Sequence, residues 1–87
     1  MYVIVVYDCE VQRVDKVRKF LKRYLNWVQN SVFEGELTKV QYLKVKHGIA
    51  EIIDKKKDCV FFYSVKSKKY LKFEEMGTRK VDVGIII

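Results

Sequence analysis

Two stretches of this sequence are apolar on both sides of an extended chain, and they restrict the possible folds more than any other feature. Residues 2–7 are all β-branched or aromatic, and residues 59–65 are mostly so. Strands of this composition are typical of a sheet that is covered on both faces. The first strand is expected to run from about Met1 to Asp8. With 87 residues, the chain has material for one domain.

Two amphipathic helices are predicted between these strands. In the first, from Val11 to Leu25, one arc collects the apolar side chains Val14, Val17, Phe20, Leu21, Tyr24 and Leu25. The second begins at Thr38, because Thr38 followed by Gln41 fits a capping box, and it ends near Asp54. Its buried arc contains Tyr42, Val45, Ile49, Ile52 and Ile53.

The segment of residues 27–37 has extended character, with Gly35 as a bend or bulge. It fits either one bent strand or a tight hairpin that turns near Asn30 and Ser31. The periodicity of the side chains does not decide between the two.

The order of these elements predicts an α+β fold, a ferredoxin-like βαββαβ sandwich whose helices cover one face of a mostly antiparallel sheet. The other face then needs a cover, which two sheets packed face to face in a dimer would supply. We expect residues 1–87 to form one domain, with a core (1–65), a basic connector (66–80) and a C-terminal strand (81–87). That strand is expected to pair with an edge of its own or the partner's sheet.

The charge of the chain favours a polyanionic partner. Eighteen Lys and Arg against eleven Asp and Glu give a formal net charge of +7, which suits DNA or RNA. A solvated, lysine-rich surface, as in thermophilic proteins, is the alternative. The cations form three clusters that suit phosphate contacts. These are Arg13, Lys16, Lys19 and Arg23, then Lys55 to Lys57, then Lys66, Lys68, Lys69 and Lys72.

Asp8 ends the first strand and is the leading candidate for chemistry. A strand end fixes the backbone while the side chain reaches open space, but the same position suits a helix N-cap or a turn. One carboxylate is a poor Mg²⁺ site, whereas a two-fold axis near Asp8 would supply a second copy. A cation held there can activate water for phosphodiester hydrolysis.

Other candidates for a site carry weaker signals. His47 falls on the polar face of the second helix and is expected to be solvated. Glu34 and Glu36 are solvated edge charges or secondary metal ligands. Trp27 and Phe33 can stack on bases or fill the core.

Cysteine content and hydropathy bear on the cellular compartment. Cys9 and Cys59 fit neither a zinc site nor a disulfide scaffold, so we expect two buried thiols. No apolar run approaches the roughly 18 residues of a membrane span, and no signal peptide is evident. We therefore expect a cytoplasmic protein that does not enter a membrane.

Three segments together resemble one known family. They are Val-Ile-Val-Val-Tyr-Asp at residues 3–8, Arg-Val-Asp-Lys-Val at residues 13–17, and Val-Gln-Asn-Ser-Val-Phe-Glu-Gly-Glu-Leu at residues 28–37. In this order the sequence resembles the second universal CRISPR-associated protein along the whole chain. The Val-Gln-x-Ser-Val-Phe-Glu-Gly pattern is the most specific part.

The resemblance implies a ferredoxin-like fold and a homodimer whose sheets pack face to face, with a C-terminal strand that extends to the partner. It implies a metal-dependent endonuclease that uses Mg²⁺ or another divalent cation on single-stranded RNA or duplex DNA. It also implies a part in spacer acquisition, in which the protein bridges two dimers of the CRISPR integrase and binds the inserted DNA.

The resemblance also assigns roles to single residues. The family's metal aspartate falls on Asp8 and its neighbouring tyrosine on Tyr7, so these two are the catalytic candidates. A helix arginine falls on Arg13, and the family's Ser and Phe fall on Ser31 and Phe33, which are candidates to contact nucleic acid. Trp27 stands where many members have an arginine, and Arg23 is the candidate to replace that phosphate contact. Lys16 and Lys19 complete the expected nucleic-acid-binding surface.

Three functions remain open on the sequence. The first is a nuclease in which two copies of Asp8 hold the metal. The second is a non-catalytic scaffold that binds duplex DNA and docks the integrase through its edges and tail. The third is a toxin-like RNA-cleaving relative of similar fold.

Overall fold

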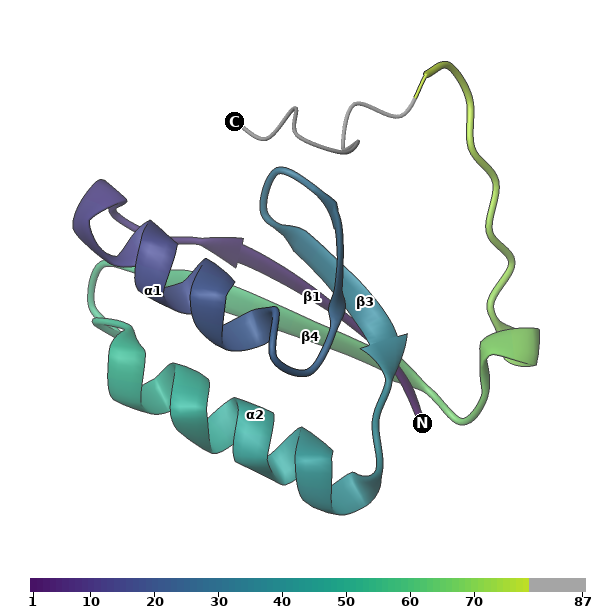
Figure 1. Cartoon of the computed structure of the whole chain (residues 1–87), viewed down its shortest axis with the longest axis horizontal. Coiled ribbons are helices and arrows are strands. Elements are labelled where there is room, and N and C mark those ends of the chain that lie inside the picture. The colour runs from purple at the N-terminus through teal and green to yellow at the C-terminus, as the bar shows by residue number, and fades with distance from the viewer. Residues whose placement is uncertain (79–87) are drawn as a thin grey trace.

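The computed structural model describes residues 1–78, which form a four-stranded antiparallel sheet covered by two helices. The strand order is β2-β3-β1-β4. The helices lie on one side of the sheet, and the segment after β4 runs away from them (Figure 1). The elements are β1 (Tyr2–Asp8), α1 (Val11–Leu21), β2 (Asn26–Gln29), β3 (Val32–Glu36), α2 (Lys39–Ile52), β4 (Cys59–Val65) and a 3-10 helix (Lys68–Tyr70). The predicted α+β fold with the ferredoxin-like βαββαβ order is confirmed.

β1 is an inner strand of the sheet and contributes three residues to the hydrophobic core. It pairs with β3 on one edge and along its whole length with β4 on the other. Alternate residues of β1, namely Val3, Val5 and Tyr7, are buried on the helix side. They pack in one cluster with Val17 and Leu21 of α1, Phe33 of β3, and Val45 and Ile49 of α2.

The opposite side of the sheet, here called the open face, is apolar and uncovered in its middle. Ile4 and Val6 of β1 lie directly across from Tyr63 and Phe61 of β4, and such pairs point to the same side of a sheet. Phe61 and Tyr63 are 52% and 57% exposed, and their ring centroids lie 6.5 Å apart. The uncovered face that the sequence predicted is therefore present in the single chain.

Residues 27–37 form a hairpin, so the alternative of one bent strand is wrong. β2 and β3 pair antiparallel with an irregularity between Trp27 and Gln29. The turn places Asn30 at φ 40°, a left-handed conformation that Asn tolerates better than most residues. The Trp27 indole N–H donates to the Asn30 carbonyl at 2.8 Å, which fixes the turn.

Both helices end earlier than predicted. α1 stops at Leu21, where the N–H groups of Tyr24 and Leu25 donate to the Leu21 carbonyl at 3.0 and 2.8 Å in a closing turn. Leu25 is nevertheless buried, so its apolar character reflects packing after the helix end. α2 ends at Ile52.

The N-terminus of α2 is as predicted. The Gln41 N–H donates to Thr38 Oγ1 at 3.1 Å, and the Thr38 N–H donates to Gln41 Oε1 at 2.9 Å, which completes the capping box.

The segment after β4 is described as far as residue 78. It forms the 3-10 helix and then continues to residue 78 without regular secondary structure. Residues 79 and 80 of the basic connector predicted at 66–80 lie outside the described residues. The C-terminal strand predicted at 81–87 lies outside the described residues. Within residues 1–78, no helix is long and apolar enough to cross a membrane.

Candidate functional site

Asp8 lies at the end of β1 on the open face. It pairs with Cys59 in the register that continues from Ile4 and Val6, so its side chain points away from the helices. The residue is exposed, and its carboxylate makes no hydrogen bond or ion pair with any other residue of the described part. The N-cap of α1 is Glu10; the cap interpretation of Asp8 is therefore wrong.

A buried carboxylate, Asp58, holds the loops around this strand end together. Its oxygens accept the backbone N–H groups of Glu10 and Asp54, both at 2.9 Å. They also accept hydrogen bonds from Arg13 Nε at 2.5 Å and from Arg13 Nη2 at 3.1 Å. The β1–α1 loop and the α2–β4 loop are thus joined beside Asp8. We call this arrangement the Asp58 clamp.

The electrostatics of the clamp favour the charged forms of both partners. Hydrogen bonding from Arg13 holds the pKa of the Asp58 carboxyl well below its usual range, against the effect of burial. The same pairing raises the pKa of the Arg13 guanidinium, which also bonds Glu10 at 3.1 Å. Arg13 was predicted to contact nucleic acid, but here its guanidinium is held by two carboxylates of the chain itself.

Tyr7 and Phe33 lie on the opposite side of the sheet from Asp8. They are 3% and 0% exposed, and their rings stack at 6.1 Å with 29° between the planes. Burial raises the pKa of the Tyr7 hydroxyl, while its hydrogen bond with Ser31 acts in the other direction. The sheet separates both side chains from the open face. A catalytic role for Tyr7 and a nucleic-acid contact by Phe33 stay predictions, and each would require the side chain to act from the buried side of the sheet.

The other predicted nucleic-acid residues are spread over two ends of the domain. Lys16 and Lys19 are exposed on α1. Arg23 follows the far end of that helix, with its guanidinium over the rings of Phe20 and Tyr24 at 5.8 and 5.7 Å. Ser31 lies near Asp8, since its carbonyl accepts the Tyr7 N–H at 3.0 Å.

Trp27 does not supply the charge that an arginine would bring to its position. It is half-buried and packs against the core. The ammonium of Lys22 lies 5.7 Å from the centre of its ring. The side chain of Lys22 therefore places a positive charge close to Trp27.

Glu34 and Glu36 lie on one side of β3, but they are far along the sheet from Asp8. They pair with Ile4 and Tyr2 near the start of β1, and Glu36 Oε2 lies 3.2 Å from the N-terminal amine. Among residues 1–78, no three His, Cys, Asp or Glu side chains gather as a possible metal site. Within residues 1–78, Asp8 is thus not part of a cluster of three or more possible metal ligands.

The two thiols lie beside Asp8, and one of them differs from expectation. Cys59 is exposed, although the sequence predicted a buried thiol, while Cys9 is half-buried. Burial raises the pKa of the Cys9 thiol, and the nearby charge of Asp58 adds to this. Cys9 is therefore a thiol, not a thiolate, at neutral pH.

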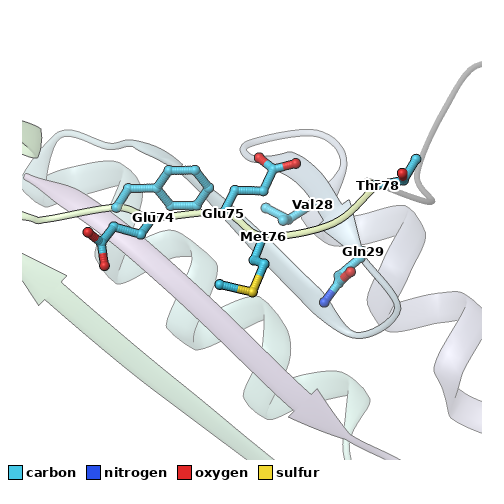
Figure 2. A pocket seen from close by; sticks show the side chains of 7 residues that line it. Val28, Gln29, Glu74, Glu75, Met76 and Thr78 are labelled. Atoms are coloured by element: carbon cyan, nitrogen blue, oxygen red, sulfur yellow. The ribbon is translucent and has the colours of Figure 1, made fainter.

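A separate hollow of about 240 Å³ lies where the segment after β4 passes the β2–β3 hairpin. Figure 2 shows Glu74, Glu75 and Met76 around it, with Val28 and Gln29 of the hairpin beside them. Among residues 1–78, its lining includes two carboxylates and no cation. These described residues therefore do not favour a phosphate.

Comparison with known proteins places the chain in a family. Residues 1–73 match the family described as CRISPR associated protein Cas2. The chain belongs to the Cas2 family. The Methanosarcina acetivorans protein named CRISPR-associated endoribonuclease Cas2 is 55% identical to it over 87 residues, which are 100% of both chains.

Solved Cas2 structures have the same fold. One, described as a crystal structure of Cas2, has a TM-score of 0.84 and 45% identity, and the match covers 100% of this chain and 98% of that one. Streptococcus pyogenes Cas2 has a TM-score of 0.77 at 34% identity, covering 88% of this chain and 100% of its own. The Cas2 resemblance read from the sequence is confirmed.

The sequence did not single out Asp58, which organises the site. Its partners Glu10 and Arg13 are 48 and 45 positions away, and no local pattern signals pairs so distant. Asp54 and Asp58 do bracket three lysines, and aspartates that flank a short polar run are a turn signal.

Proposed function

We propose that the chain is a homodimeric, metal-dependent endonuclease of a CRISPR system that cleaves single-stranded RNA. The observation that carries the proposal is the Asp8 carboxylate, which is exposed, unpaired within residues 1–78 and located on the apolar open face. The endoribonuclease name of close Cas2 relatives supports the reaction class.

A second copy of the chain is needed to complete the site. The open face exposes Phe61 and Tyr63, and packing it against the same face of a second chain would remove these rings from water. Asp8 lies on that face, so a two-fold axis there brings two carboxylates toward each other. Two like charges at close range favour a shared cation.

The residues fit a divalent ion with oxygen ligands. The two Asp8 carboxylates would hold the ion, since Mg²⁺ is usually bound through one or two carboxylates together with water and phosphate oxygens. When bound, the ion polarises the phosphoryl group and makes a bound water more acidic. The chain's own residues hold the ion through Asp8 and hold the strand through exposed cations.

Asp8→Asn tests this proposal, because it keeps the shape of the side chain and removes its charge. We expect loss of Mg²⁺-dependent cleavage of labelled single-stranded RNA by about 10²-fold or more, with an unchanged melting temperature. Glu51→Gln is the matched control, since it also removes one exposed carboxylate that pairs with no other residue of the described part. Cleavage that survives Asp8→Asn at the wild-type rate would refute the metal site.

A scaffold function is the second candidate. The outer edges of β2 and β4 pair with no other strand of the described part, so both are available to a docking chain. The net charge of +7 suits duplex DNA. In this role the chain would bridge two dimers of the CRISPR integrase.

Spacer acquisition in cells separates the two functions. If acquisition persists with Asp8→Asn while the purified variant no longer cleaves, the biological role is the scaffold. If acquisition and cleavage are lost together and DNA binding is kept, the nuclease is the biological activity.

A further inference from the structure

Residues 54–58 form a turn that is held by four hydrogen bonds among its own residues. Asp54 Oδ1 accepts the Lys56 N–H at 2.9 Å. The Asp54 carbonyl accepts the N–H groups of Lys57 at 2.9 Å and Asp58 at 2.7 Å. Asp58 Oδ2 accepts the Asp54 N–H at 2.9 Å. An aspartate at each end thus fixes the backbone that carries the lysines between them. We call residues 54–58 the lysine turn.

The Asp58 clamp fixes the lysine turn relative to Asp8. The carboxylate that closes the turn also binds the Glu10 N–H and the Arg13 guanidinium, and Glu10 lies two residues after Asp8. The residue that follows the turn, Cys59, pairs directly with Asp8. The turn and the Asp8 carboxylate therefore belong to one braced end of the sheet.

The three lysines of the turn are available for a ligand. Lys55, Lys56 and Lys57 are exposed, and none of their ammonium groups forms an ion pair with another residue of the described part. Asp54 and Asp58, the acids closest to them in sequence, use their carboxylates within the fold.

Several other lysines are already engaged. The ammonium groups of Lys22, Lys46, Lys68 and Lys69 lie 5.3–5.7 Å from the centres of aromatic rings, and that of Lys72 lies 3.9 Å from Glu74. The lysine turn thus concentrates three unengaged cations.

We propose that the lysine turn is a phosphate-binding site that holds the nucleic-acid backbone next to the phosphate at Asp8. Lysine ammonium groups bind phosphate without reading sequence. Because the backbone of the turn is already ordered, binding a strand requires this part of the protein to order only its lysine side chains. The proposal rests on the proposed function and assigns the part of the surface that positions the substrate.

The test replaces the three cations and compares the result with an equal charge change elsewhere. The variant is Lys55→Gln, Lys56→Gln and Lys57→Gln, which keeps both turn aspartates. The control is Lys39→Gln, Lys44→Gln and Lys66→Gln. All three control lysines are exposed; Lys39 begins α2 and Lys66 follows Val65, which pairs with Tyr2 at the opposite end of β1.

Binding of fluorescein-labelled single-stranded RNA is measured by anisotropy over a range of KCl concentrations. Each phosphate contact to a single strand contributes about 0.7 to the slope of log K against log salt. We expect the turn variant to reduce the slope by about 2 and to weaken binding by about tenfold or more at low salt. The control should reduce the slope by less than about 0.7. Equal losses in both variants, or an unchanged slope in the turn variant, overturn the proposal.

Failure of the proposed function gives a different result. Binding is measured in the Asp8→Asn background, so it does not depend on cleavage. If the turn variant loses RNA binding in this background as expected, while the protein with Asp8 intact does not cleave RNA, the nuclease is refuted and this proposal stands. Wild-type protein that cleaves RNA with no contribution from the turn refutes this proposal alone.

A second measurement needs no variant. Lysine acetylation of the wild-type protein, followed by mass spectrometry, should show Lys55 to Lys57 protected by bound RNA. Lys39, Lys44 and Lys66 should remain reactive. Protection of the control lysines without protection of the turn would overturn the assignment even if the turn variant failed to fold.

Discussion

Asp58 is a buried carboxylate that binds backbone N–H groups and a guanidinium at once. Replacing it by Asn puts an amide NH₂ against groups that are themselves donors, so at least one buried donor loses its acceptor. We expect Asp58→Asn to lower the melting temperature by roughly 10 °C or more. If the variant has the same melting temperature as the wild type, the interpretation of Asp58 as a clamp is wrong.

The same residue predicts how stability depends on pH. The pKa of Asp58 is lowered in the folded state, so the unfolded chain takes up a proton near pH 4 while the folded chain stays ionised. The stabilisation is therefore complete above about pH 5 and is lost as the pH falls toward the folded pKa. Urea unfolding at about pH 7 and about pH 4 should show a smaller difference for Asp58→Asn than for the wild type.

Tyr7 and Phe33 should behave as core residues. We expect Tyr7→Phe to lower the free energy of unfolding by about 1 kcal/mol, the value of a typical hydrogen bond, and to keep cleavage of single-stranded RNA. Phe33→Ala should lower the free energy of unfolding by about 3–5 kcal/mol. Loss of cleavage in Tyr7→Phe without a change in stability would instead give the hydroxyl a part in the reaction.

At the scale of elements, the two helices approach closely because of one glycine. A Cβ built on Gly48 of α2 would lie 2.1 Å from Phe20 Cζ of α1. Alanine is a better helix former by about 1 kcal/mol, so Gly48→Ala would raise stability if space allowed. The collision with Phe20 instead predicts that Gly48→Ala lowers stability.

We expect Gly48→Ala to lower the free energy of unfolding by about 1–3 kcal/mol, as overpacking does. In a double-mutant cycle with Phe20→Leu, the smaller side chain should recover part of the loss. A Gly48→Ala variant that is more stable than the wild type would show that the ring moves aside without cost.

Sequence patterns predicted the elements better than their ends or their long-range contacts. Thr38 and Gln41 located the start of α2 because a capping box is local. The end of α1 was placed four residues too late, because Leu25 is apolar for a packing reason that the helical period cannot distinguish. The Asp58 clamp was not predicted, since it joins residues that meet only after the sheet forms.

At the scale of the molecule, the open face predicts self-association. Phe61→Lys puts a charge in the middle of that face, where burial against a second copy would be costly. We expect light scattering after size exclusion to give a dimer for the wild type and a monomer for Phe61→Lys. Leu43→Lys is the control, because Leu43 is 56% exposed on α2, on the other side of the sheet. A wild-type monomer at working concentration would rule out the paired Asp8 site.

The position of β1 in the sheet also affects how the chain is made on the ribosome. β1 is synthesised before β4, and one of its edges stays unpaired until β4 has been translated, more than 50 residues later. At about 5–20 residues per second, that edge is exposed for several seconds. An apolar edge of this kind is a template for other nascent chains. Fast translation through β4 is therefore expected to favour soluble protein, and pausing before it to favour aggregation.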